Sequence, residues 1–478
     1  MFALEFEEAA ATVNTYLRVH ESFDLTVKRL RIGGRRAIFY CVEELVKDDV
    51  LERLLEFFSG LSEKQMRDIS CARAFMDTYV TYSQASLQED LEAFGTAVLS
   101  GAVGMLAEGF DKAIVLDPRT YPARAMKEPD NDRLLRGSHE GFLETVLSNI
   151  ALIRRRIRNV QLTFKRYQIG CSSKTDVVVC YLADLANPKQ LARVDERLRE
   201  IDVPSLTMGQ ESLRECLLPD QPWNPFPRFR YTERPDTAAA CLNSGNILIL
   251  VDGSPDAMIV PTGIFDYIQD TNDYCFPPLL GTYFRHLRSF IFFLSMMFVP
   301  VWYLLQLHEA ELPEWTYFIF VNKPNGVSIF LQLVVSEFII NTLRLASLNT
   351  PSALSNSFAV VGALVLGEFG VSSGIFVPEV VLFMAFSAIS NFTQTSYELG
   401  FAVKRCRMLI LTLTFLFDTW GFVAGVVLVL LLIACTRTLD GYTYLYPLIP
   451  YDKQALTSLL FRRQLRSRKK HAKRKGEG

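Results

Sequence analysis

The chain has 478 residues, 50% of them hydrophobic, and a formal net charge of −2, a length that usually accommodates two to four folding units. Its mean hydropathy of +0.17 is close to that of soluble proteins, so any membrane-embedded part must be confined to one region. Nine scattered cysteines and five histidines form no CxxC motif and no cluster with metal-ligand spacing, which argues against a metal centre or an assignable catalytic site. We therefore expect no cofactor and no enzyme activity.

The charge is distributed unevenly along the chain. The last 17 residues hold nine Lys or Arg and one Glu, a net charge of +8, which leaves about −10 for the rest. Such a tail could bind nucleic acid, but because it follows a hydrophobic region, a cytoplasmic juxtamembrane segment (453–478) is the simpler interpretation. This interpretation of the tail implies no nucleic-acid partner. The N-terminus lacks the features of a cleavable signal, so the soluble part is expected to stay in the cytoplasm.

Residues 1–125 are expected to form a first cytoplasmic α/β subdomain. Residues 36–42 have the composition of a buried strand, and residues 50–61 have helical apolar spacing. Three short apolar runs follow and are predicted to be adjacent strands of a meander: 96–101, 103–109 and 112–117.

A second α/β subdomain is expected over residues 126–283, after a proline- and glycine-containing linker at 118–141. The apolar residues between Leu143 and Ile157 predict a helix. Strands are predicted at 175–182, 246–253 and 257–261, the last two joined by a Ser-Pro-Asp turn.

Residues 284–452 are predicted to be a multi-span helical membrane domain. Residues 289–308 contain no Asp, Glu, Lys or Arg and are long enough to span a bilayer. Four further candidate segments are the polar-containing helix 327–344, the uncharged runs 345–367 and 380–397, and the long run 408–436, which Asp418 interrupts.

The number of membrane crossings is constrained by the basic residues. Arg285, Arg288 and the basic tail favour the same cytoplasmic side, which requires an even number of crossings. Either the helix 327–344 is interfacial, or residues 408–436 form a hairpin broken near Asp418. The residues alone leave both alternatives open.

Two features of this region are candidates for lining a pore, and each has an alternative explanation. Small residues at three- and four-residue spacing would form one stripe on a helix, which fits either close helix packing or the lining of a pore: Ser355, Ala359, Ala363, Gly367, Gly370 and Gly374. Glu337 and Glu368 are carboxylates within apolar sequence, so they should either attract cations in a ring or form an internal ion pair. For Glu337 the partner would be Arg344 or a residue on a neighbouring helix.

Charged residues in the second soluble subdomain are candidates for assembly or gating, together with Arg344 of the membrane region. A salt-bridge network at a domain interface is the favoured interpretation of the soluble group. This group consists of Arg136, Glu140, Glu233, Arg234 and Asp236.

Several strings resemble the A-subunit family of bacterial spore germinant receptors. They are DRLLRGSHEGFLETVLSNIALIRRRI (132–157), FRYTERPD (229–236), ILVDGSPDAMIVP (249–261) and VVGALVLGE (360–368). A second set is most similar to the stage V sporulation protein AF branch of that family: ELPEW (311–315), IFVPEV (375–380), SYEL (396–399) and GYTYLYPLIPY (441–451).

The resemblance implies a protein of the spore inner membrane that helps to trigger germination. It implies a homo-oligomer, a pentamer in that family, that conducts monovalent cations and has as partners a small membrane protein and germinant receptor subunits. Asn341, Leu345 and Glu368 depart from the pattern of receptor A-subunits, so the resemblance does not transfer the ion selectivity of receptors. A secondary transporter and a non-conducting scaffold are the competing hypotheses, although we find no inverted repeat of a transporter type.

Overall fold

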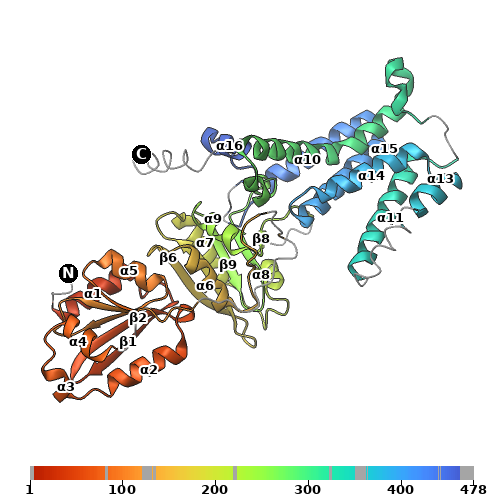
Figure 1. Cartoon of the computed structure of the whole chain (residues 1–478). Coiled ribbons are helices and arrows are strands. Elements are labelled where there is room, and N and C mark those ends of the chain that lie inside the picture. Colours follow the sequence, from red (N-terminus) through yellow and green to blue (C-terminus); the bar gives the residue numbers. More distant parts are fainter. Residues whose placement is uncertain are drawn as a thin grey trace. The chain divides into compact units, whose positions relative to one another are not determined.

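The computed structural model describes residues 5–80, 84–120, 132, 136–218, 223–321, 326–349, 362, 364–439, 441 and 443–462. Two compact units are present (Figure 1). The first consists of Met1–Asp220 with Phe229–Pro261, and the second of Gln221–Arg228 with Thr262–Gly478. Of the predicted domain boundaries, residue 125 lies outside the described residues and residue 283 lies inside a helix.

The first unit contains two lobes, each built on a five-stranded antiparallel sheet. Lobe 1 has the strand order β1-β2-β4-β5-β3, with helices on both faces of the sheet. Its elements are α1 (Phe6–Leu17), β1 (Leu25–Ile32), β2 (Arg35–Val42), α2 (Asp48–Ser59), α3 (Glu63–Arg67), α4 (Ala72–Tyr79), β3 (Ala85–Gln88), α5 (Leu91–Leu99), β4 (Val103–Ala107) and β5 (Ala113–Leu116).

One predicted strand of lobe 1 is wrong. Residues 96–101 belong to the end of α5 and the turn that follows it. Asp90 caps this helix by accepting a hydrogen bond from the Ala93 N–H, and Phe94, Val98 and Leu99 are buried at helical spacing. The other two runs are strands β4 and β5, as predicted.

Lobe 2 has the strand order β6-β7-β9-β10-β8. The predicted helix and strands of this lobe are confirmed as α6, β7, β9 and β10. The elements are α6 (Val146–Arg156), β6 (Leu162–Ile169), β7 (Thr175–Leu182), α7 (Pro188–Arg199), α8 (Gln210–Leu217), β8 (Arg230–Thr232), α9 (Pro235–Leu242), β9 (Ile247–Val251) and β10 (Ala257–Val260).

The two lobes repeat one folding unit, a relationship that the sequence analysis missed. In lobe 1, Ser86 of β3 pairs with Val115 of β5. In lobe 2, Arg230 of β8 pairs with Ile259 of β10, so both partners are shifted by the same 144 positions. The turns after β4 and β9, the fourth strands of the two lobes in chain order, also match. Gly109 and Gly253 in these turns have φ values of 83° and 81°, which only glycine adopts without strain.

The second unit is helical and includes three helices that are long and apolar enough to cross a membrane among its described residues: α10 (Pro278–Leu307), the stretch Ile329–Ser347 of α11, and α15 (Tyr397–Cys435). Its remaining elements are η2 (Ile264–Tyr267), η3 (Thr271–Cys275), η4 (Glu309–Glu311), η5 (Glu314–Ile319), α11 (Ile329–Asn349), the π-helical η6 (Leu364–Phe369), α13 (Gly370–Ser372), α14 (Pro378–Phe392) and α16 (Lys453–Leu460). Residues 289–307 of the span predicted at 289–308 thus lie within α10. The separate span predicted at 345–367 is wrong at its start, because α11 continues without a break to Asn349; residues 350–361 lie outside the described residues.

Helix α15 is two helices joined by a sharp turn at Asp418, whose backbone has φ 55° and ψ −133°. A Cβ atom placed on Gly421 would overlap the carbonyl of Leu413, and one on Gly425 would lie 3.0 Å from the Cα of Ile410. These approaches require the chain to fold back on itself. Of the two alternatives that the sequence left open, the hairpin at 408–436 is the one observed, with a first arm at 397–417 and a second arm at 419–435.

The contacts show the direction of each helix. Phe330 of α11 stacks on Phe415 of α15 with ring centroids 4.1 Å apart, and farther along Lys404 donates to Asn341, so α11 and the first arm are antiparallel. Phe298 and Trp302 of α10 contact Phe386 and Phe383 of α14, respectively, so α10 and α14 are also antiparallel. The backbone N–H of Arg462 donates to Thr282, which places the end of α16 beside the start of α10.

Candidate functional site in the helical unit

A buried ion-pair cluster joins α11 to the first arm of α15. The Arg407 guanidinium donates to Glu337 Oε2 at 2.5 Å, and Lys404 Nζ lies 3.2 Å from Glu337 Oε1. This second contact is an ion pair without a hydrogen bond, since Glu337 Oε1 has no hydrogen-bond partner among the described residues. All three side chains are at least 93% buried, where charges are retained only when they are paired.

Other polar groups complete this cluster and connect it to α10 and α14. Arg407 donates to the backbone carbonyl of Ser295 at 3.2 Å and to the hydroxyl of Ser387. Lys404 donates to Asn341 Oδ1 at 2.6 Å. Four helical segments therefore meet at a polar centre, which fixes their relative positions in an otherwise apolar bundle.

Arg344 does not serve as the partner of Glu337. Its guanidinium lies instead over the rings of Phe392, Tyr397 and Phe401. The internal pairing of Glu337 is thus with the neighbouring helix, which was the second of the two partners considered from the sequence.

The small-residue stripe is described only from Gly367 onward; Ser355, Ala359 and Ala363 lie outside the described residues. Gly370 is buried, but a Cβ atom added to Gly367 or Gly374 would meet no atom of the described residues within 4 Å. Glu368 is exposed and lies on the π-helical segment η6, a geometry that is frequent at functional sites. One side of this segment is therefore not covered by the part of the chain that the structure describes.

The depth of Glu368 in the bundle follows from the ends of its segment. Gly362 lies against Leu343, and the Val377 N–H donates to Gln332 at 2.8 Å. Because Glu337 lies between these two levels of α11, Glu368 lies at a similar depth. One carboxylate at this depth is buried and paired, and the other is exposed.

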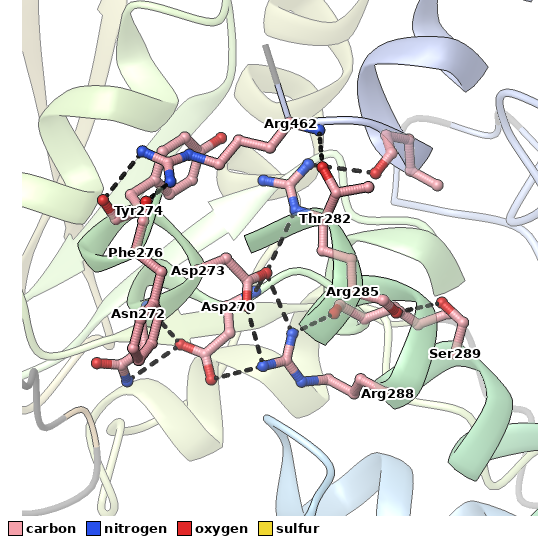
Figure 2. A network of polar contacts seen from close by, with 12 residues as sticks. Asp270, Asn272, Asp273, Tyr274, Phe276, Thr282, Arg285, Arg288, Ser289 and Arg462 are labelled. Carbon is pink, nitrogen blue, oxygen red and sulfur yellow. Dashed lines mark hydrogen bonds and ion pairs between the residues drawn. The ribbon is translucent and has the colours of Figure 1, made fainter. Parts of the chain in front are cut away.

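A second polar network surrounds the start of α10 (Figure 2). Asp273 of η3 is 2% exposed and lies 3.3 Å from Arg285 and 3.2 Å from Arg288. Arg462 donates to the carbonyls of Tyr274 and Phe276. The network thus ties together η3, the start of α10 and the residue at which the basic tail begins.

The charged candidates of the soluble part form local contacts within lobe 2. Arg234 is fully buried and donates to Asp236 at 2.8 Å and to the carbonyl of Ser138 at 2.7 Å. Burial opposes ionisation of Glu140, but hydrogen bonds from Arg156 and Arg155 outweigh it and lower the pKa of this carboxyl. The backbone carbonyl of Glu233 accepts from the Phe142 N–H, and Arg136 also lies in the described segment at residues 136–142.

Sequence analysis missed both cations that pair with Glu337. Lys404 and Arg407 lie between the predicted segments 380–397 and 408–436, whereas the structure includes them in helix α15. The available signal was the group of three cations, Lys404, Arg405 and Arg407, next to long apolar sequence, because charged residues within a membrane helix normally face a bundle interior.

Comparisons with known proteins agree over nearly the whole chain. The family model described as Bacillus/Clostridium GerA spore germination protein matches residues 13–474. Stage V sporulation protein AF of Bacillus subtilis is 35% identical over 441 residues, covering 92% of this chain and 89% of that protein. Spore germination protein GerLA of Bacillus cereus is 27% identical, covering 89% and 87% of the two chains.

Among solved structures, the first unit is similar to the N-terminal domain of the A subunit of the Bacillus megaterium spore germinant receptor GerK3. The identity is 24% and the TM-score 0.42, over 54% of this chain and 94% of that one. The extent of the family match, together with a relative that is 35% identical over 92% of the chain, establishes the relationship. The chain is a membrane protein with a role in spore germination, and it belongs to the GerA family of spore germination proteins.

Proposed function

We propose that this protein is a non-catalytic, homo-oligomeric channel or channel subunit of the spore inner membrane that releases monovalent cations during germination. The observation that carries the proposal is the uncovered η6 segment with its exposed carboxylate. An exposed charge at the depth of a buried ion-pair cluster is costly against lipid. A neighbouring subunit or a water-filled pore would remove that cost.

The alternating directions of the helices support a closed arrangement of six crossing segments. These are α10, α11, the segment that contains η6 and α13, α14, and the two arms of α15. An even number returns the chain to the side on which α10 begins, in agreement with the contact between Arg462 and Thr282. We assign that side to the cytoplasm (the spore core), because Arg285, Arg288 and the basic tail are all at this end.

Oligomer formation would give the open glycine face a partner. A Cβ atom on Gly367 would meet no atom of the described residues within 4 Å, whereas small residues in membrane helices normally allow close approach of another helix. A pentamer is the stoichiometry implied by the family resemblance. A small membrane protein and germinant receptor subunits are the partners that the resemblance implies.

The test measures oligomer size and ion flux on the same purified variants in liposomes. Gly367→Phe should leave the oligomer intact and abolish flux, and Glu368→Gln should lower the preference for potassium over chloride. Leu382→Phe is the matched control, because Leu382 is 66% exposed on α14 and tolerates a larger side chain if it faces lipid. Gly374 is less suitable, since its φ of 70° penalises any side chain.

The outcomes separate the competing functions. A wild-type oligomer without flux would identify a scaffold, and slow flux that saturates with ion concentration would identify a transporter. Dissociation of the Gly367→Phe variant would show that the stripe packs against another helix and does not line the pore.

A further inference from the structure

Arg344 is held in a box of three aromatic rings. Its guanidinium carbon lies 4.7 Å from the ring centroid of Phe401, 5.2 Å from that of Phe392 and 5.3 Å from that of Tyr397. The rings come from the end of α14 and the start of α15, so they converge on α11 from different segments. Such a box fixes the position of a guanidinium without neutralising its charge.

The positive charge of Arg344 is not balanced within the described part of the chain. Its side chain has no hydrogen bond or ion pair there. The nearest cluster does not supply a counter-charge, since Lys404 and Arg407 already share the single carboxylate of Glu337. Arg344 is half-buried, so its guanidinium remains accessible to an anion from outside.

The box lies at the depth where lipid headgroups are expected. It is built at the last residue of α14 and the first residue of α15, which is the end of the bundle where Thr395 donates to the carbonyl of Tyr267 just ahead of α10. The rings of Phe392, Tyr397 and Phe401 are 67%, 63% and 50% exposed. Exposed aromatic side chains at the ends of membrane helices are typical of the interface between acyl chains and headgroups.

We propose that Arg344 and its aromatic box bind the phosphate of an anionic phospholipid. The guanidinium is suited to this ligand because its planar donors form two parallel hydrogen bonds with phosphate oxygens. The three exposed rings would lie against the glycerol and upper acyl region of the same lipid. The excess of cations at this end of the bundle favours an anionic headgroup over a zwitterionic one.

The competing occupant is a carboxylate from a neighbouring protein chain. A peptide carboxylate would satisfy the same guanidinium, but it would not use the exposed ring surfaces that face outward around it. Substitution of Arg344 distinguishes the two occupants. A loss of lipid retention indicates the phospholipid, and a loss of subunit assembly indicates the carboxylate of a neighbouring chain.

The experiment uses the full chain in detergent micelles that contain phosphatidylcholine with or without phosphatidylglycerol, and counts retained lipids by native mass spectrometry. The wild type should retain phosphatidylglycerol in preference to phosphatidylcholine. Arg344→Gln should weaken this retention at least tenfold, and Arg344→Lys should weaken it less, since a charge without the planar fork remains. Arg405→Gln is the matched control, because Arg405 is an exposed arginine of the same helical region outside the box, and it should behave as the wild type.

A second variant keeps the charge and removes the box. Tyr397→Leu combined with Phe401→Leu should weaken retention several-fold while the protein elutes as the wild type does. Equal retention of lipid by the wild type and Arg344→Gln would overturn the proposal. An Arg344→Gln variant that dissociates from neighbouring subunits but keeps its lipid would overturn it as well. Displacement of the lipid by an equal concentration of glycerol 3-phosphate would show that the site recognises a soluble phosphate ester, and would overturn the assignment to lipid.

Discussion

Arg154 of α6 donates two hydrogen bonds to Asp24 of lobe 1, at 2.9 and 3.1 Å, and neither side chain is more than 6% exposed. The same guanidinium donates to the carbonyl of Leu162 and lies over the ring of Phe164. Lobe 1 also contributes the Phe23 N–H, which donates to the Phe164 carbonyl. The two copies of the repeat are therefore joined through a charge pair from which water is excluded.

The soluble part should fold without the helical unit. Both lobes have their own buried cores, and among the described residues the first candidate membrane helix begins at Pro278. Expression of residues 1–283 should give a monodisperse protein with one cooperative unfolding transition. An aggregated or molten product from every boundary tried between 261 and 283 would show that the lobes depend on the rest of the chain.

Removing one member of the lobe-joining pair should destabilise that fragment strongly. Arg154→Met leaves the Asp24 carboxylate buried without a cation, a change that typically costs about 3–5 kcal/mol. Urea unfolding would measure it. Adding Asp24→Leu should recover most of the loss, because the double variant no longer buries an unpaired charge; a double variant as unstable as the single one would contradict this account.

Asp256 should make the stability of lobe 2 depend on pH. Burial, and then the nearby Glu233, raise the pKa of Asp256 to about 6, so the folded state binds this proton more tightly than the unfolded state does. Its contribution to stability is present near pH 4 and is lost as the pH rises through 6. Asp256→Asn should stabilise the fragment at pH 7.5 by on the order of 2 kcal/mol, and have little effect at pH 4. A pH-independent difference between the two proteins would contradict the assigned shift.

The hairpin of α15 should not tolerate a side chain at Gly421. A Cβ there would overlap backbone atoms of Leu413, which cannot move independently of the first arm. Gly421→Ala should therefore lower the melting temperature of the full chain in detergent and reduce the yield of folded protein. Gly367→Ala serves as the control, since a Cβ at Gly367 meets no atom among the described residues; equal effects of the two substitutions would argue against the turn.

The Glu337 cluster should respond to neutralisation as a unit. Glu337→Gln leaves two buried cations without a carboxylate and should cost at least about 3 kcal/mol. The triple variant with Lys404→Met and Arg407→Met should regain most of that stability, because no buried charge remains. The exposed Glu368→Gln provides the comparison, and thermal unfolding in detergent should show little change for it.

Local patterns were sufficient for much of the fold. The strand at 175–182 coincides with β7, and the apolar spacing of residues 143–157 contains α6. Short elements next to glycine were harder, because residues 96–101 are too few to distinguish strand from helix by period. The meander was therefore wrong at its first element, where the cap at Asp90 decides the structure.

Relationships between distant residues were not predictable in the same way. Glu337 was singled out because it is a charge in an apolar helix, but its partner lies 70 positions away, and the pairing depends on how α11 packs against α15. The repeat was missed because what its copies have in common is the register of their paired strands, which the structure shows, and few residues of the sequence. Asp418 interrupts the apolar run 408–436 with a single charge, which does not by itself distinguish a turn from a continuous helix. The sequence therefore left the hairpin as one of two alternatives.

The turn in α15 also has a consequence for how the protein enters the bilayer. The first arm carries Lys404, Arg405 and Arg407, and each cation near the centre of an isolated helix costs about 2.5–3.5 kcal/mol on insertion. The second arm, residues 419–435, has no charged residue and can supply the missing hydrophobicity only if it enters together with the first. Insertion of the two arms as a single hairpin, after α11 has already brought Glu337 into the membrane, would deliver two of these cations directly to their counter-charge. The order of elements in the chain, with α11 synthesised before α15, provides that sequence of events.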